Sequence, residues 1–158
     1  MRRWAEFATE AAHLEAFGRS RLERRVAYLA TIRADGSPRL HPVSPFIGGG
    51  CLVIYMEPTS PKVADLRRDP RYALHCGVED NEGGGGEFYV TGRAEEIAGA
   101  ERRQTAVGWA AAVGYEALER HVFFEFKLGE VLATTYDKGP KRERWRAGSA
   151  ATGPGPRM

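Results

Sequence analysis

The sequence predicts a mainly β protein, a small antiparallel barrel flanked by helices. Short strand-like segments follow one another along the chain and are joined by turns rich in glycine. Only about three helical segments are interspersed, so the strand–helix alternation of a parallel α/β sheet is absent. No GxGxxG motif follows the first predicted strand, which argues further against a dinucleotide-binding Rossmann sheet.

Strands and helices are assigned from the spacing of apolar residues and from the turn residues between them. The first helix is expected to end at Gly18. The three prolines of the second strand must lie at edges, bulges or non-bonded positions. Helices are expected at residues 6–17, 60–69 and 100–118. Strands are expected at residues 26–33, 38–46, 51–56, 71–78, 87–94, 121–136 and 141–146.

Two turns carry specific sequence signals. Asp35-Gly36 between the first two strands predicts a tight hairpin. The four consecutive glycines Gly83–Gly86 raise the question of a phosphate cradle. They lack the Lys-Ser/Thr of a P-loop, and the residues that follow them are strand-like rather than helical. A flexible hairpin loop is therefore the interpretation that the sequence favours.

A chain of 158 residues fits one domain with a real hydrophobic core. We find no internal repeat and no second-domain boundary. A single domain with an N-terminal helix is predicted over residues 1–147. Residues 148–158 consist of small residues, glycine and proline, and are expected to form a disordered tail.

Composition narrows the class of function. The chain is 42% hydrophobic and 28% charged, as in soluble globular proteins. A net charge of +2 and the lack of a known RNA- or DNA-binding motif argue against a nucleic-acid partner. No signal peptide or membrane-spanning run is evident. Two cysteines without metal-ligand spacing suit the reducing cytoplasm, and the four dispersed histidines predict no metal site.

The segment around Lys62 is the most informative part of the chain. Ser60 is placed to cap a helix, Pro61 to fill its first position and Lys62 to lie in its first turn. The start of a helix carries partial positive charge and unpaired N–H groups, so it favours anions. A lysine there makes sense if an anion such as phosphate is bound. The alternative, an exposed lysine on an ordinary helix, stays open at this point.

Three segments together resemble the pyridoxamine 5'-phosphate oxidase-like proteins, the FMN-binding split-barrel superfamily. They are residues 28–43 (YLATIRADGSPRLHPV), 59–74 (TSPKVADLRRDPRYAL) and 88–95 (FYVTGRAE). The resemblance extends from about Val26 to Ile97, and more loosely to Arg146. No single motif is decisive, but three motifs in the family's order make a specific signal.

The resemblance implies a six-stranded antiparallel split β-barrel that forms a homodimer. FMN would lie at the dimer interface and be contacted by both subunits. Basic and hydroxyl side chains of the second strand, the third strand and the next turn would hold its phosphate. The matching positions are Arg39, His41, Pro42, Val43, Ser44, Tyr55, Met56, Ser60 and Lys62.

Some positions depart from the family pattern. Ser44 appears where the oxidase has a basic residue, and Pro61 replaces a basic residue beside the lysine. Arg144-Trp145-Arg146 only faintly matches the substrate-binding C-terminus of the oxidase, so pyridoxamine-phosphate oxidation itself is not predicted. Related split-barrel proteins use the deazaflavin F420 or bind heme, and Lys62 cannot separate F420 from FMN.

A flavin carries the hydride itself, and the protein supplies orientation and electrostatics. This agrees with a sequence that has no evident nucleophile–base pair, so no catalytic residue is assigned. Arg39 and His41 are candidates to stabilise a reduced flavin. The resulting prediction is an FMN-dependent oxidoreductase acting on a small molecule. The alternatives are an F420-dependent reductase, or a flavin- or heme-binding protein without turnover.

Overall fold

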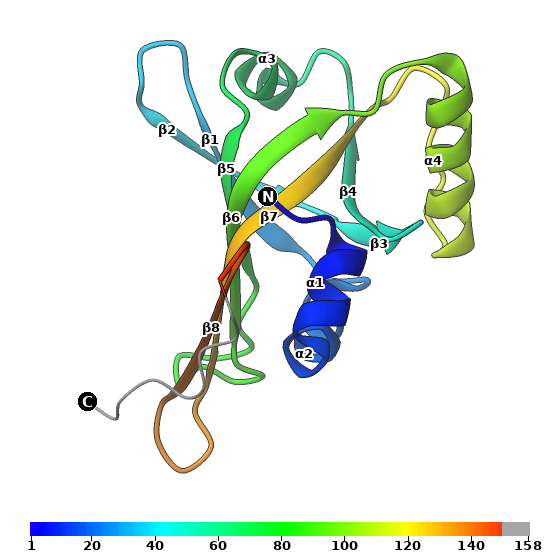
Figure 1. Cartoon of the computed structure of the whole chain (residues 1–158). Helices are drawn as coiled ribbons and strands as arrows, with labels where there is room; N and C mark the ends of the chain where they lie inside the picture. The colour runs from blue at the N-terminus through cyan, green and yellow to red at the C-terminus, as the bar shows by residue number, and fades with distance from the viewer. Residues whose placement is uncertain (150–158) are drawn as a thin grey trace.

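The computed structural model describes residues 1–149, which form one antiparallel sheet with helices around it (Figure 1). The strand order is β2-β1-β5-β6-β7-β4-β3, and β8 pairs with β7. The strands are β1 (Ala27–Ile32), β2 (Pro38–Val43), β3 (Phe46–Gly48), β4 (Cys51–Met56), β5 (Arg71–Cys76), β6 (Glu87–Glu96), β7 (Val122–Thr135) and β8 (Lys141–Arg146). The helices are α1 (Trp4–Glu10), α2 (Ala12–Leu22), α3 (Pro61–Arg68) and α4 (Ala100–Ala112).

The mainly antiparallel half-barrel with flanking helices confirms the predicted fold class, but the expected number of six strands is wrong. Within residues 1–149 there are eight strands. One reason is that Ser44 and Pro45 interrupt the strand predicted over residues 38–46. Its two parts, β2 and β3, lie at opposite ends of the strand order. Because of this break, two consecutive segments of the chain lie at the two ends of the curled sheet.

The first hairpin forms as predicted. β1 pairs with β2 from Ala27↔Val43 to Ile32↔Pro38, and Gly36 in the turn has a φ of 84°. Only a glycine adopts this left-handed conformation without strain. The other predicted glycine-rich loop also joins two paired strands, β5 and β6. Within this loop, the carboxylate of Asp80 accepts hydrogen bonds from the backbone N–H groups of Glu82 and Gly84.

The predicted helix over residues 6–17 is wrong in its boundaries. Two helices, α1 and α2, meet at Ala11, and Gly18 lies inside α2 instead of ending it. A Cβ at position 18 would collide with the ring of Phe88, which is fully buried. Gly18 therefore lets α2 approach the sheet closely, a role that helix-ending signals in the sequence do not distinguish from a stop.

The longest strand, β7, is continuous through Gly129 and carries a β-bulge. Thr91 pairs with Glu130 and Gly92 pairs with Leu128, so Gly129 has no partner residue across the ladder. β8 then pairs with β7 in antiparallel orientation, and it covers the residues 141–146 predicted for the last strand. α4 ends at Ala112, so the helical extension expected as far as residue 118 is wrong.

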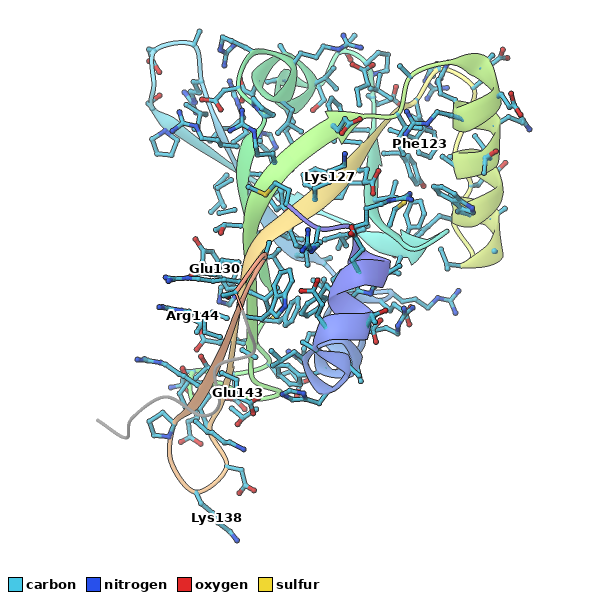
Figure 2. All side chains as sticks on the ribbon, in the orientation of Figure 1. Phe123, Lys127, Glu130, Lys138, Glu143 and Arg144 are labelled. Carbon is cyan, nitrogen blue, oxygen red and sulfur yellow. The ribbon has the colours of Figure 1, made fainter. Side chains whose placement is uncertain are left out.

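Two hydrophobic clusters lie on opposite faces of the sheet. The main cluster, inside the half-barrel, includes Phe7, Phe88 and Trp145. A second cluster lies under α4, and it includes Val53 and Phe123. Figure 2 shows Phe123 beside α4, which stands at the far side of the sheet from the β1–β2 hairpin. The two faces can therefore support separate sites.

None of the helices in residues 1–149 has the length and apolar character needed to span a bilayer. The proposed division into a domain and a tail stays a prediction. Ala147 donates its N–H to the carbonyl of Gly129, 2.9 Å away, at the end of the β7–β8 hairpin. The rest of the predicted tail, from residue 150 onward, lies outside the described residues.

Candidate cofactor-binding site

Three basic side chains gather where β2 faces the start of α3. In β2, alternate residues are partly or fully buried, which places Arg39, His41 and Val43 on one face. Lys62 follows Pro61 in the first turn of α3, as predicted. Arg39 lies close enough to Lys62 for its charge to act on the lysine, and the charges of both residues act on His41. The structure therefore brings the predicted basic residues together from two separate elements.

Lys62 is a partly buried cation. Burial, and next the positive charge of Arg39, lower the pKa of its ammonium group. Its Nζ donates a hydrogen bond of 2.9 Å to the hydroxyl of Ser60. No carboxylate within residues 1–149 forms an ion pair with Lys62. Such a cation gains most from an anionic ligand, because an anion would offset both burial and the neighbouring charge.

Ser60 stands at the N-cap position with an extended backbone, but its predicted capping hydrogen bond is absent from the described structure. Its hydroxyl oxygen instead accepts a hydrogen bond from the ammonium group of Lys62. Pro61 occupies the start of the helix, as predicted. The hydroxyl and the ammonium group are thus linked at the helix end where N–H groups remain unpaired.

A buried carboxylate that the sequence analysis missed holds this region together. Asp65, on α3, is only 3% exposed. It accepts hydrogen bonds from Thr31 Oγ1 at 2.8 Å and Arg39 Nε at 2.7 Å. Arg68 Nη2 donates a third bond of 3.0 Å. Burial raises the pKa of Asp65, but the three hydrogen bonds outweigh it and hold that pKa below its usual value. Asp65 therefore fixes Arg39 as a charged, oriented donor.

A sequence signal for Asp65 did exist. It lies one residue before Leu66 and two after Val63, both buried, so the helical spacing places it near the apolar face of α3. A carboxylate so close to a buried face needs a charged partner. Its partner Arg39 is 26 residues earlier in the chain, and only the folded structure identifies it.

The remaining predicted site residues lie elsewhere. Val43 and Met56 are buried in the main cluster, whereas Pro42 and Ser44 are exposed. Tyr55 lies on the α4 face of the sheet, with ring centroids 5.0 Å from His121 and 5.4 Å from Phe123. Arg39, His41, Ser60 and Lys62 thus form one cluster, which we call the basic cluster. For all nine predicted positions, inside and outside this cluster, cofactor contact stays a prediction.

The position of His41 in the basic cluster predicts how its pKa changes when Lys62 is replaced. Burial, then Lys62, then Arg39 lower the pKa of its imidazole. Replacing Lys62 by alanine removes one of these positive charges, so the pKa of His41 should rise. An NMR pH titration of the imidazole protons in both proteins measures the change. An unchanged or lower pKa of His41 would show that the two side chains are not electrostatic neighbours.

Within residues 1–149, no group of three or more His, Cys, Asp or Glu side chains is arranged to hold a metal ion. The basic cluster, by contrast, presents two cationic side chains and a hydroxyl, which are chemically suited to recognise an anion. Arg39 is held by Asp65, while neither Lys62 nor His41 forms an ion pair with a carboxylate within residues 1–149. A phosphate group matches this donor set in charge and in hydrogen-bond number.

The half-barrel with its flanking helices defines a split-barrel protein. A family model described as pyridoxamine 5'-phosphate oxidase matches residues 6–135. The chain belongs to this family, as the resemblance in the sequence predicted. Among curated proteins, none matches the chain.

Solved structures with the same fold have diverse descriptions. A NimC/NimA family protein from Clostridium acetobutylicum has a TM-score of 0.64 and 19% identity, over 89% of this chain and 95% of that one. A heme-binding protein from Mycobacterium smegmatis has a TM-score of 0.62 and 20% identity, over 83% and 57%. A protein described as an F420 reductase has a TM-score of 0.54 and 19% identity, over 71% and 93%. At these identities the likeness shows the fold alone.

Proposed function

We propose that this protein is an FMN-binding oxidoreductase that acts on a small organic molecule. The observation that carries the proposal is the basic cluster at the start of α3, in a chain of the pyridoxamine 5'-phosphate oxidase family. Arg39, Lys62 and the hydroxyl of Ser60 would bind the phosphate of the flavin. The bound flavin would supply hydride transfer.

The donor set fits a phosphate group. Asp65 holds Arg39 by its Nε, so the terminal N–H groups of the guanidinium remain available for a ligand. Lys62 supplies a second charge, and the helix end adds backbone N–H groups. A dianion would also offset the burial, and next the repulsion between cations, that lower the pKa of Lys62 and of His41. The chain's own residues thus anchor and orient the cofactor.

We further propose a homodimer with the cofactor at the interface. The outer face of the β1–β2 hairpin is apolar and exposed: Leu40 is 67% exposed and Tyr28 is 45% exposed. These residues share that face with Pro42, which pairs with Tyr28. A second copy would cover this surface and could supply a further wall for the cofactor. A monomer in sedimentation equilibrium at micromolar concentration would contradict this arrangement.

The phosphate assignment predicts a specific loss of affinity. Replacing Lys62 by alanine should weaken FMN binding about tenfold or more, because one charge-assisted hydrogen bond is lost. The quenching of flavin fluorescence on titration measures the dissociation constant. Lys138→Ala is the matched control, since Lys138 lies at the tip of the β7–β8 hairpin, far from α3 (Figure 2). Equal affinity of the Lys62 variant and the wild type would refute the assignment.

An F420-dependent reductase is the main alternative, because one protein of the same fold is described as an F420 reductase. A heme-binding protein without turnover is another, because a second relative in fold carries that description. Titration of one preparation with FMN, F420 and heme separates the three. Preferred uptake of FMN, with flavin absorbance bands, supports our proposal, whereas preferred uptake of either other cofactor replaces it.

The two buried free thiols, Cys51 and Cys76, support a location in the reducing cytoplasm.

A further inference from the structure

A cavity of about 260 Å³ lies on the other face of the sheet, between the N-terminal segment, β7 and α4. None of the basic-cluster residues lines it. Its floor is formed by Cys51, Ile97 and Glu125, and Arg3 closes one side. Glu101, Arg102, Thr105 and Trp109 line it from α4. In Figure 2, α4 stands away from Lys127 of β7.

The floor contains an ion pair that orients one arginine. Glu125 is only 4% exposed, and its Oε1 accepts a bond of 2.8 Å from Arg3 Nε. Arg3 Nη2 also donates to the sulfur of Cys51 at 2.7 Å. Burial, and next the charge of Glu125, raise the pKa of the Cys51 thiol to about 11, so the sulfur is neutral at physiological pH. The remaining N–H groups of the guanidinium are not used by these two contacts.

The position of Arg3 follows from the backbone that precedes it. Arg2 forms an isolated bridge with Leu128, with both N···O distances at 2.8 Å. This bridge attaches the N-terminal segment to β7 and leads Arg3 over Glu125. A buried carboxylate on a sheet face is costly without such a partner, which explains why the charged pair occurs together.

The α4 wall supplies an aromatic surface and a second arginine. Trp109 lies against the turn at Gly48 and Gly49, where added Cβ atoms would collide with its side chain. The two glycines therefore let the indole pack tightly beside the cavity. Arg102 lies in the first turn of α4, and its side chain forms no ion pair or hydrogen bond with the described residues. The carboxylate of Glu95, which is paired with Lys127, is near enough to interact with its charge. The N-cap residue of α4, Gly99, provides no side-chain cap for the unpaired N–H groups nearby.

We propose that this cavity binds a small organic carboxylate with a flat apolar body. The carboxylate would lie between the guanidinium groups of Arg3 and Arg102, near the start of α4, where an anion is favoured. The flat body would pack on Trp109 and Ile97. Glu125 acts as a positioning residue that holds Arg3 in place. The site is separate from the basic cluster, so it does not depend on the proposed cofactor.

Two carboxylates line the cavity and limit the affinity for this ligand: Glu125, which is paired with Arg3, and Glu101, which forms no ion pair with the described residues. Glu101 also lies in the first turn of α4, where its charge is itself favourable. It repels a bound carboxylate, so we expect benzoate, the simplest probe, to bind with a dissociation constant on the order of 1 mM. Glu101→Gln should tighten benzoate binding about twofold, because this repulsion is removed.

The experiment follows the three tryptophan indole N–H signals in a ¹H–¹⁵N NMR titration of the whole chain with benzoate. Trp109→Phe assigns the signal of the cavity indole. The other two indoles serve as internal controls, because Trp4 donates to Glu15 and Trp145 donates to Glu10 on the other face. Benzoate should move the Trp109 signal alone. Benzamide and benzamidine, which have the same shape but no negative charge, should bind at least about tenfold more weakly.

A matched pair of variants tests the arginine. Arg102→Gln should weaken benzoate binding about tenfold, whereas Arg142→Gln, on exposed β8, should leave it unchanged. The proposal is overturned if Arg102→Gln binds benzoate like the wild type, or if benzamidine binds more tightly than benzoate. It is also overturned if benzoate moves all three indole signals together, or none of them at 20 mM, roughly twenty times the expected dissociation constant.

Discussion

Replacing Gly92 by alanine is expected to destabilise the protein by about 3 kcal/mol. Gly92 lies at the β-bulge between β6 and β7, and its backbone faces the carbonyl oxygen of Lys127. An alanine Cβ would collide with that oxygen, which also accepts a hydrogen bond of 3.1 Å from the hydroxyl of Tyr72. The strand would have to move and disturb this bond. Urea denaturation followed by circular dichroism measures the loss.

The same substitution at Gly108 should have the opposite sign. Gly108 lies inside α4, and no neighbouring atom comes within 4 Å of a Cβ added there. Alanine has the higher helix propensity, so Gly108→Ala should stabilise the protein by about 0.5–1 kcal/mol. If both variants lose equal stability, or if Gly92→Ala is neutral, the close contact between β6 and β7 is not as described.

Replacing Asp65 by alanine is expected to cost about 3 kcal/mol of stability and also to weaken cofactor binding. The substitution removes the acceptor of Thr31, Arg39 and Arg68 at once. Arg39 would remain partly buried without its counter-ion and would lose its orientation. Because the pKa of Asp65 is held below its usual value, its contribution is present above the unfolded pKa of about 3.9. It is lost as the pH falls through the lower, folded pKa.

Two comparisons isolate the role of Asp65. Asp137→Ala removes an exposed carboxylate in the β7–β8 turn, and its effect should stay within about 0.5 kcal/mol. Lys62→Ala should weaken FMN binding but leave the urea midpoint nearly unchanged, because Lys62 makes no ion pair within residues 1–149. Asp65→Ala should change both quantities. An Asp65 variant with wild-type stability would contradict the anchoring role of this carboxylate.

Local sequence signals predicted several elements well because neighbouring residues determine them. The Asp35-Gly36 turn fixes the β1–β2 hairpin, and Pro61 marks the start of α3. Gly18 was misread, because a glycine that permits close packing on Phe88 looks the same as one that ends a helix. The break at Ser44 and Pro45 was also missed, since strand propensity does not reveal which neighbour each part will pair with.

Some residues of the candidate site were likewise predictable from the sequence, and others were not. The resemblance to the family implied that Arg39 and Lys62 share a ligand, and the structure places them as electrostatic neighbours. Asp65 was missed, because its role depends on contacts with β1 and β2 that are distant in the sequence. The sequence also could not predict on which face of the sheet the Tyr55 side chain lies. Its strand is apolar on both faces, so alternation could not say which face would meet α4.

The sequence by itself determined the family and the mainly β class, and it predicted an anion site around Lys62. These features depend on residue type and short spacing, which are recognisable without knowledge of contacts between distant segments. Only the tertiary structure decided the strand order, the anchoring of Arg39 by Asp65, and the cavity formed by Arg3, Glu125 and α4. Each of these joins segments far apart in the chain, and their pairing is selected by the packing and charge balance of the whole sheet.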